Sequence, residues 1–197
     1  MVSGNLDIVN LALSLLGESP IQSIDEGSAA AVYAKQQFDP ARRAALRSYN
    51  WTFALRRVRL TRVADEVPGV YQFTYQLPAD CLRPIRVIDP EKDRTPPDAS
   101  GTTGYEPVGA NRITCDLENP LLEYVADITD PVFFDDLFVQ SLAHRLAAGL
   151  ATPITGDANR AQALMGMART LEREAAAQSG RERRDPATVN PYVEARN

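Results

Sequence analysis

The stretch Phe53-Ala-Leu-Arg-Arg-Val-Arg-Leu-Thr-Arg62 decides the predicted fold, because the spacing of apolar residues changes there. Before Phe53, apolar residues recur every three or four positions, as in amphipathic helices. From Phe53 onward, apolar and polar residues alternate, as in a strand that buries one face. The chain is therefore predicted to change from helical to β structure at about residue 53.

Two helices are predicted before this change. The first covers residues 5–16 and ends at Gly17, a residue type that favours helix ends. The second begins after Ser28, a suitable N-cap, and runs to about Tyr49. Pro40 falls inside it and lacks the amide hydrogen that a helix needs, so we expect a kink or two consecutive helices.

The alternating pattern continues beyond residue 62 in several short segments. The dipeptide Pro68-Gly69 indicates a turn, and residues 89–104, rich in Pro, Asp, Thr and Gly, indicate a loop. Further strands are expected at Tyr71–Leu77, Leu82–Ile88, Arg112–Cys115 and Leu121–Val125.

Helical patterns return near the end of the chain. Thr129-Asp130-Pro131 combines an N-cap with a first-turn proline and predicts a helix to about Leu150. Asp157 is the expected N-cap of a last helix that runs to about Gln178. Residues 180–197 show no periodic apolar face, so burial within the subunit cannot offset the entropy lost on ordering them.

These elements predict a mainly α fold. It is a four-helix bundle with a small antiparallel β insertion between the second and third helices, followed by an extended C-terminal arm. The corresponding segments are residues 1–52, 53–127, 128–179 and 180–197.

Charge and length exclude several classes of protein. The 197 residues carry a net charge of −5, which argues against a protein whose main task is to grip phosphates. The sequence has no run of roughly 20 apolar residues that would span a bilayer and no basic secretory signal. We therefore expect the protein to fold in the cytoplasm where it is made and to have no role at a membrane.

Residues suited to catalysis are few. Gly101-Thr-Thr-Gly104 lacks the lysine of a phosphate loop, and His144 is the only histidine. Cys81 and Cys115 are expected to be reduced and buried, because their spacing matches no zinc pattern. Asp135 and Asp136 are adjacent and diverge on a helix. We therefore expect no catalytic residues, no cofactor and no metal.

The basic run Arg56–Arg62 allows two interpretations. Strand alternation places Arg57, Arg59 and Arg62 away from the apolar face. A solvated edge or a contact between subunits is the favoured interpretation, since charged edges discourage aggregation of strands. A contact with an acidic partner or with passing DNA is the alternative.

Several stretches resemble the tail tubular protein A family of short-tailed phages and related head-to-tail adaptors. The most specific are Trp51-Thr-Phe53-Ala54 and Leu77-Pro-Ala-Asp-Cys-Leu-Arg83. The others are Ile8–Leu13 with Leu16-Gly17-Glu18, Arg43–Leu46 with Tyr49-Asn50, Tyr71–Gln76, Tyr124 with Thr129-Asp130, and Phe138–Ala151 with Ile154-Thr155-Gly156.

The resemblance implies a structural virion protein of the neck or tail, not an enzyme. Its subunits are expected to form a ring, usually a dodecamer, beneath the portal protein. Such a ring extends the channel for double-stranded DNA and carries the next tail component, a nozzle or tail-tube protein. The resemblance also implies that the C-terminal arm binds the portal, with its apolar anchors and arginines in contact: Arg181, Arg183, Arg184, Pro191, Tyr192, Val193 and Arg196.

Two other classes remain open at this point. One is a different phage assembly or head-completion protein, or a helical protein-binding module, that forms no ring. The other is a small enzyme or metal-binding protein, which the single histidine and the lack of convergent carboxylates disfavour.

Overall fold

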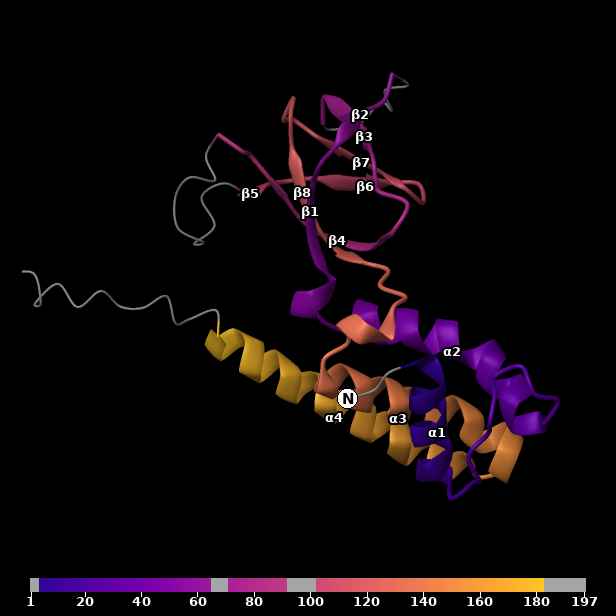
Figure 1. The fold of residues 1–197 in the computed structure, drawn as a ribbon. Coiled ribbons are helices and arrows are strands. Elements are labelled where there is room, and N and C mark those ends of the chain that lie inside the picture. Colours follow the sequence, from indigo (N-terminus) through magenta and orange to yellow (C-terminus); the bar gives the residue numbers. More distant parts are fainter. Residues whose placement is uncertain (1–3, 65–70, 92–101, 183–197) are drawn as a thin grey trace, which may run out of the picture.

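The computed structural model describes residues 4–64, 71–91 and 102–182. Helices α1 (Asn5–Leu16) and α2 (Ala29–Ser48) precede the strands, and α3 (Asp136–Thr155) and α4 (Ala158–Glu182) follow them. Two short 3-10 helices, η1 (Thr52–Ala54) and η2 (Pro131–Phe133), lie where the chain enters and leaves the β part. The helices gather at one end of the molecule and the strands at the other (Figure 1).

The strands of the described residues form two antiparallel sheets of four strands each. The first sheet has the order β1 (Leu55–Arg59), β8 (Leu121–Ala126), β4 (Cys81–Ile88) and β5 (Thr102–Thr103). The second has the order β2 (Thr61–Arg62), β3 (Phe73–Gln76), β7 (Arg112–Cys115) and β6 (Glu106–Val108).

The predicted fold class is therefore wrong. A mainly α bundle with a small insertion was expected, but the fold is mixed, with a β part of two full sheets beside the helices. Alternation in the sequence indicated several of the strands. It did not indicate that they divide between two sheets, or that the short strands β5 and β6 lengthen them.

A single residue connects the two sheets along the first strands. Leu60 separates β1 from β2, and its amide donates to the carbonyl of Pro120 at 3.0 Å. The chain thus leaves the edge of one sheet and enters the edge of the other without a loop. Leu60 is itself buried and belongs to the core.

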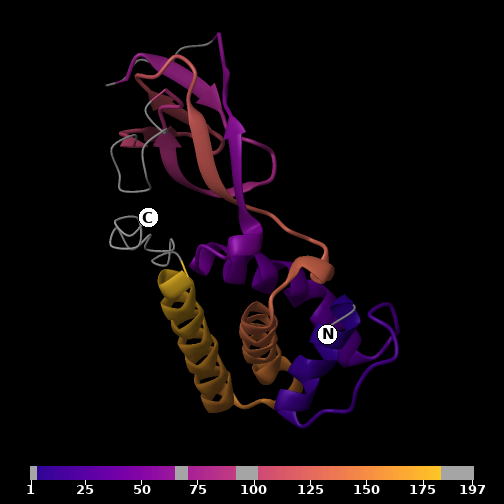
Figure 2. The ribbon, with the colours of Figure 1, turned by 60° about the vertical axis from the view of Figure 1, so that its left-hand side comes forward.

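Helix α3 is the centre of the helical part. It packs against α1, α2 and α4, and Figure 2 shows it between α4 and α1. Its buried face includes Phe138, Leu142, Leu146 and Leu150, all fully buried. An apolar face this wide fits a helix with neighbours on several sides.

Most helix boundaries follow from capping. The hydroxyl of Ser28 accepts from the amide of Ala31 at 3.3 Å, as predicted. Gly17 ends α1 with φ of 74°, a left-handed conformation that glycine adopts without strain. Pro40 lies inside one helix, so two consecutive helices do not occur. It is exposed, where water can bond the carbonyl it leaves without a partner.

The start of the third helix differs from the prediction. Asp130 caps the short helix η2, because its carboxylate accepts from the amide of Val132 at 3.0 Å. The α-helix begins only at Asp136, with Asp135 as N-cap accepting from the amide of Phe138 at 2.7 Å. Asp157, in contrast, accepts from the amide of Arg160 at 2.9 Å in the first turn of α4, as predicted.

Candidate functional site

An aromatic cluster holds the β part to the helices. Trp51 is almost fully buried between α2 and η1, and its ring meets that of Phe138 edge-on at 5.1 Å. Phe53 and Phe134 complete the cluster, both within 5.7 Å of Phe138 or of each other. Edge-on aromatic pairs add to the stabilisation from burial alone. The chain entry and exit of the β part are thereby packed against α3.

Arginines of α2 add polar bonds across the same junction. Arg42 is 3% exposed, forms an ion pair with Asp127 and donates to the carbonyl of Ile128 at 2.6 Å. The guanidinium of Arg47 donates to the carbonyl of Leu82 in β4. Buried charges need such partners, because an unpaired buried charge is strongly destabilising. These bonds fix the β part relative to α2.

A row of three charged side chains crosses the first sheet above this junction. Arg57 of β1, Glu123 of β8 and Arg86 of β4 occupy paired positions on adjacent strands. Nε of Arg57 donates to Oε2 of Glu123 at 2.7 Å, and a terminal nitrogen of Arg86 donates to the same oxygen at 3.1 Å. Glu123 is only 9% exposed.

The two arginines control the charge state of Glu123. Burial acts to raise its pKa, but the hydrogen bonds and charges of Arg86 and Arg57 outweigh burial and lower the pKa below 4.5. Glu123 is therefore an anion near neutral pH. Two guanidinium groups therefore share one carboxylate.

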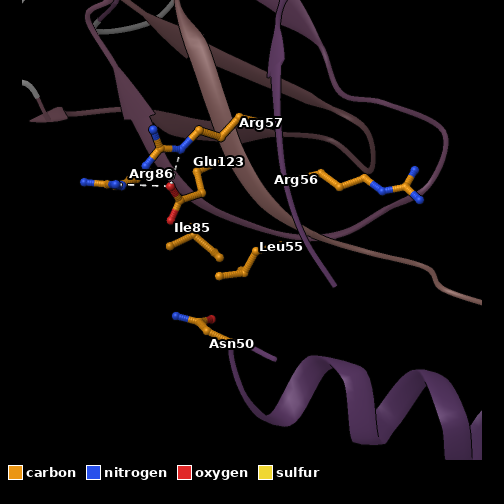
Figure 3. A pocket seen from close by; sticks show the side chains of 7 residues that line it. All are labelled: Asn50, Leu55, Arg56, Arg57, Ile85, Arg86 and Glu123. Atoms are coloured by element: carbon orange, nitrogen blue, oxygen red, sulfur yellow. Dashed lines mark hydrogen bonds and ion pairs between the residues drawn. The ribbon is translucent and has the colours of Figure 1, made fainter. Parts of the chain in front are cut away.

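A pocket of about 800 Å³ lies beside this row, where the β part meets the end of α2 (Figure 3). Leu55 and Ile85 give it an apolar part, and Glu123 is its single carboxylate. Its remaining lining residues are Asn50, Arg56, Arg57 and Arg86. Such a pocket suits an apolar side chain that has negative charge beside it.

The wall near Asn50 is fixed by another arginine. A terminal nitrogen of Arg83 donates to Oδ1 of Asn50 at 2.6 Å. Nε of Arg83 is buried without a hydrogen-bond partner among the described residues. Asn50, which lines the pocket, is thus held by a side chain from β4.

A second exposed feature lies at the other boundary of the β part. Val132 and Phe133 of η2 are 71% and 62% exposed, the highest values among the large apolar residues described. The η2 turn is held by the Asp130 cap, and the amide of Phe134 donates to the carbonyl of Pro131 at 3.0 Å. The two apolar side chains are therefore presented on a fixed turn.

Of the seven arm residues expected to bind the portal, the structure describes the position of one. Arg181 lies in the last turn of α4, which ends at Glu182 and not near Gln178 as predicted. The other six lie outside the described residues: Arg183, Arg184, Pro191, Tyr192, Val193 and Arg196. The expected turn at Pro68-Gly69 also lies outside them.

The structure also places the residues that were considered for catalysis or metal binding. His144 is half-buried in α3, and its Nδ1 lies 2.8 Å from the carbonyl of Gln140. Cys115 is buried and Cys81 half-buried, and both are free thiols. Within residues 4–64, 71–91 and 102–182, no group of three or more His, Cys, Asp or Glu could hold a metal.

The basic run is only partly what the sequence suggested. Arg57 belongs to the charged row, whereas the guanidinium of Arg62 lies 4.3 Å from the centre of the Phe73 ring, a cation–π contact. Neither Glu123 nor Arg86 was singled out in the sequence. A signal existed, because each is a charged residue inside a predicted apolar strand.

A family comparison fits this architecture. The model of a family described as tail tubular protein matches residues 6–96, from α1 through the charged strand β4, just under half of the chain. Over these residues the chain is similar to the tail tubular protein family. The resemblance seen in the sequence is thereby confirmed. No curated protein matches the chain.

The tail tubular protein family supplies the general role. The match supports a structural component of a phage tail, found in the virion with other phage structural proteins. Among the described helices, none is both long and apolar enough to cross a membrane.

Proposed function

We propose that this tail tubular protein is a head-to-tail adaptor. Its subunits form a ring, a dodecamer, under the portal protein. The ring extends the DNA channel and serves as the platform for the nozzle or tail-tube protein. The observation that carries the proposal is the family match over residues 6–96, which includes both N-terminal helices and strands β1 to β4.

The charge of the chain supports a place around passing DNA. A net charge of −5 means that the average wall of a ring repels phosphates. Adhesion to DNA grows with each phosphate that is neutralised, so a wall of this kind lets the duplex slide. The arginines of the charged row, Arg57 and Arg86, form ion pairs with Glu123. Arg42, at the junction with the helices, forms an ion pair with Asp127.

Attachment to the portal is assigned to the C-terminal arm, residues 180–197. Its sequence has few apolar residues and no helical periodicity, so its ordering requires a surface from another molecule. Pro191, Tyr192 and Val193 would be the apolar anchors, and the arginines at 181, 183, 184 and 196 the polar contacts.

A reconstitution with the portal tests this function. The full chain is mixed with the portal protein of the same phage and examined by mass photometry and negative-stain electron microscopy, with each protein alone as control. We expect a ring under the portal and a gain in mass of several times 21.6 kDa. An unchanged portal mass would contradict the proposed adaptor function. One bound subunit without a ring would favour an assembly or head-completion protein that forms no ring.

A further inference from the structure

We propose that the η2 turn of one subunit inserts Phe133 into the pocket between the β part and α2 of the next subunit. This inference rests on the proposed function, because it describes the contact between neighbours in the ring. The occupant of the pocket is thus a second copy of this chain.

The first argument is the exposure of the turn. Val132 and Phe133 stand in solvent, while the next residue, Phe134, is buried with its ring 4.7 Å from that of Phe138. A rigid turn that presents an aromatic side chain loses little entropy on binding. Aromatic anchors of this kind dominate the energy of protein interfaces when a pocket encloses them.

The second argument is that the pocket and the turn are complementary. The pocket combines Leu55 and Ile85 with three arginines and one glutamate. The turn combines its two apolar residues with exposed carboxylates on both sides, Asp130 before it and Asp136 after it. Arg56 is paired with Asp80 at 3.0 Å, and Arg57 and Arg86 share Glu123. Apolar surface therefore meets apolar surface, and the guanidinium groups beside the pocket meet the carboxylates that flank the turn.

The third argument is their position in the subunit. The pocket lies between the strands and the end of α2 (Figure 3). The η2 turn, the short orange helix in Figure 1, lies where the chain passes from the strands to the helices. In Figure 3, the segment that leaves β8 for η2 runs away from the side chains of Arg57, Glu123 and Arg86. The turn therefore does not fill the pocket of its own subunit.

Two different patches at one level are what a ring requires. An interface between unlike patches passes from each subunit to the next and closes into a ring when the rotation allows it. A two-fold symmetric dimer would instead join the same two patches reciprocally, twice within one pair of subunits. Trapping such a contact would stop at dimers, whereas a ring gives longer products.

Disulfide trapping in the assembled complex tests this contact. Phe133→Cys is combined with Leu55→Cys in a Cys81→Ser background, and the chain is assembled on the portal and mildly oxidised. We expect a ladder of dimers, trimers and higher multimers on a denaturing gel. Chains carrying Phe133→Cys alone, mixed with chains carrying Leu55→Cys alone, should give dimers and no longer products.

The matched control moves the cysteine from the turn to another exposed apolar residue. Met167 of α4 is 52% exposed, so Met167→Cys with Leu55→Cys should give no ladder. Rings on the portal without a ladder from the Phe133 pair would overturn this inference and leave the adaptor function intact. The absence of rings with the unmodified chain would remove both.

A second measurement avoids cysteine altogether. Phe133→Ala should weaken association between subunits at least tenfold, measured as the concentration at which rings form on the portal, because truncating a central anchor is costly. Met167→Ala should leave that concentration unchanged. Equal ring formation by the two variants would count against the Phe133 contact.

Discussion

The indole N–H of Trp51 donates a hydrogen bond of 2.9 Å to the main-chain carbonyl of Ala45, one turn from the end of α2. The carbonyls in the last turn of a helix have no partner within the helix. Trp51 therefore both ends α2 and fills the junction with α3. The same residue lies in one of the two most specific stretches of the family resemblance.

Replacing Trp51 by Ala should lower the free energy of unfolding by about 3–5 kcal/mol, because it leaves a cavity in the aromatic cluster. Trp51→Phe keeps part of the packing and loses the hydrogen bond, so it should cost clearly less. Urea unfolding followed by circular dichroism measures both. A loss below about 1 kcal/mol for the Ala variant would mean that the cluster does not hold the junction.

Arg42 and Arg43 form a matched pair for testing the polar junction. Arg42→Met should destabilise the fold by about 3–5 kcal/mol, because it removes the ion pair with Asp127 and the hydrogen bond to the Ile128 carbonyl from the buried junction. Arg43 also pairs with Asp127, at 3.3 Å, but its side chain is 57% exposed. Arg43→Met should cost under about 1 kcal/mol. Equal losses would refute a special role for the buried arginine.

The charged row gives a pH-dependent prediction. The pKa of Glu123 is lower in the folded chain than its ordinary value of 4.5. A carboxyl of this kind stabilises the fold above its unfolded pKa, and that stability is lost as the pH falls through the folded pKa. Glu123→Gln should therefore cost about 1–3 kcal/mol near pH 7 and progressively less below pH 4.5.

The measurement is urea unfolding of the two proteins over a pH series. Glu174→Gln, at an exposed position of α4, serves as the control and should leave the stability unchanged. A difference between wild type and Glu123→Gln that stays constant down to pH 3 would contradict the ion-pair explanation.

The cysteines should react slowly in the folded chain. Burial raises the pKa of the Cys81 thiol to about 11, with a further contribution from the charge of Asp80, and burial also raises the pKa of Cys115. Because the thiolate is the reactive form, Cys81 should react with a thiol reagent at pH 8 on the order of a hundredfold more slowly than a free cysteine. Reaction is followed by absorbance, with the urea-unfolded chain as control. Fast labelling of the folded chain would contradict burial of these groups.

Deleting residues 181–197 separates folding from attachment. We expect the shortened chain to unfold at the same urea concentration as the full chain, because its core lies before these residues. It should no longer bind the portal in mass photometry. Portal binding at full strength would transfer the attachment site to the body of the subunit.

The sequence predicted local structure better than its arrangement. Four of the five strands expected between residues 53 and 125 occur, because alternation shows which face of each strand is buried. The remaining one, Phe53–Arg62, begins as η1 and is divided at Leu60 into β1 and β2. Alternation does not say which strand is the neighbour, so the division into two sheets was missed. The short strands β5 and β6 were not predicted, because a segment of three residues or fewer is too short to show an alternating pattern.

The same reasoning explains what was found and missed at the site. The arginine run of β1 stood out as a cluster of like residues in sequence. Arg86 and Glu123 are distant in sequence and meet Arg57 only through the antiparallel register of β1, β8 and β4. The exposed turn at Phe133 was predicted as the first turn of a helix, since Asp130-Pro131 is also a common helix start.

The single-residue link at Leu60 has a mechanical consequence. Because only Leu60 separates β1 from β2, no flexible linker lies between the two sheets along this part of the chain. A force on the second sheet, β2-β3-β7-β6, is therefore transmitted toward α2 through the backbone and the hydrogen-bonded strands. A movement of the second sheet is therefore passed on to the first. In the proposed adaptor ring, each subunit would then act as a stiff strut.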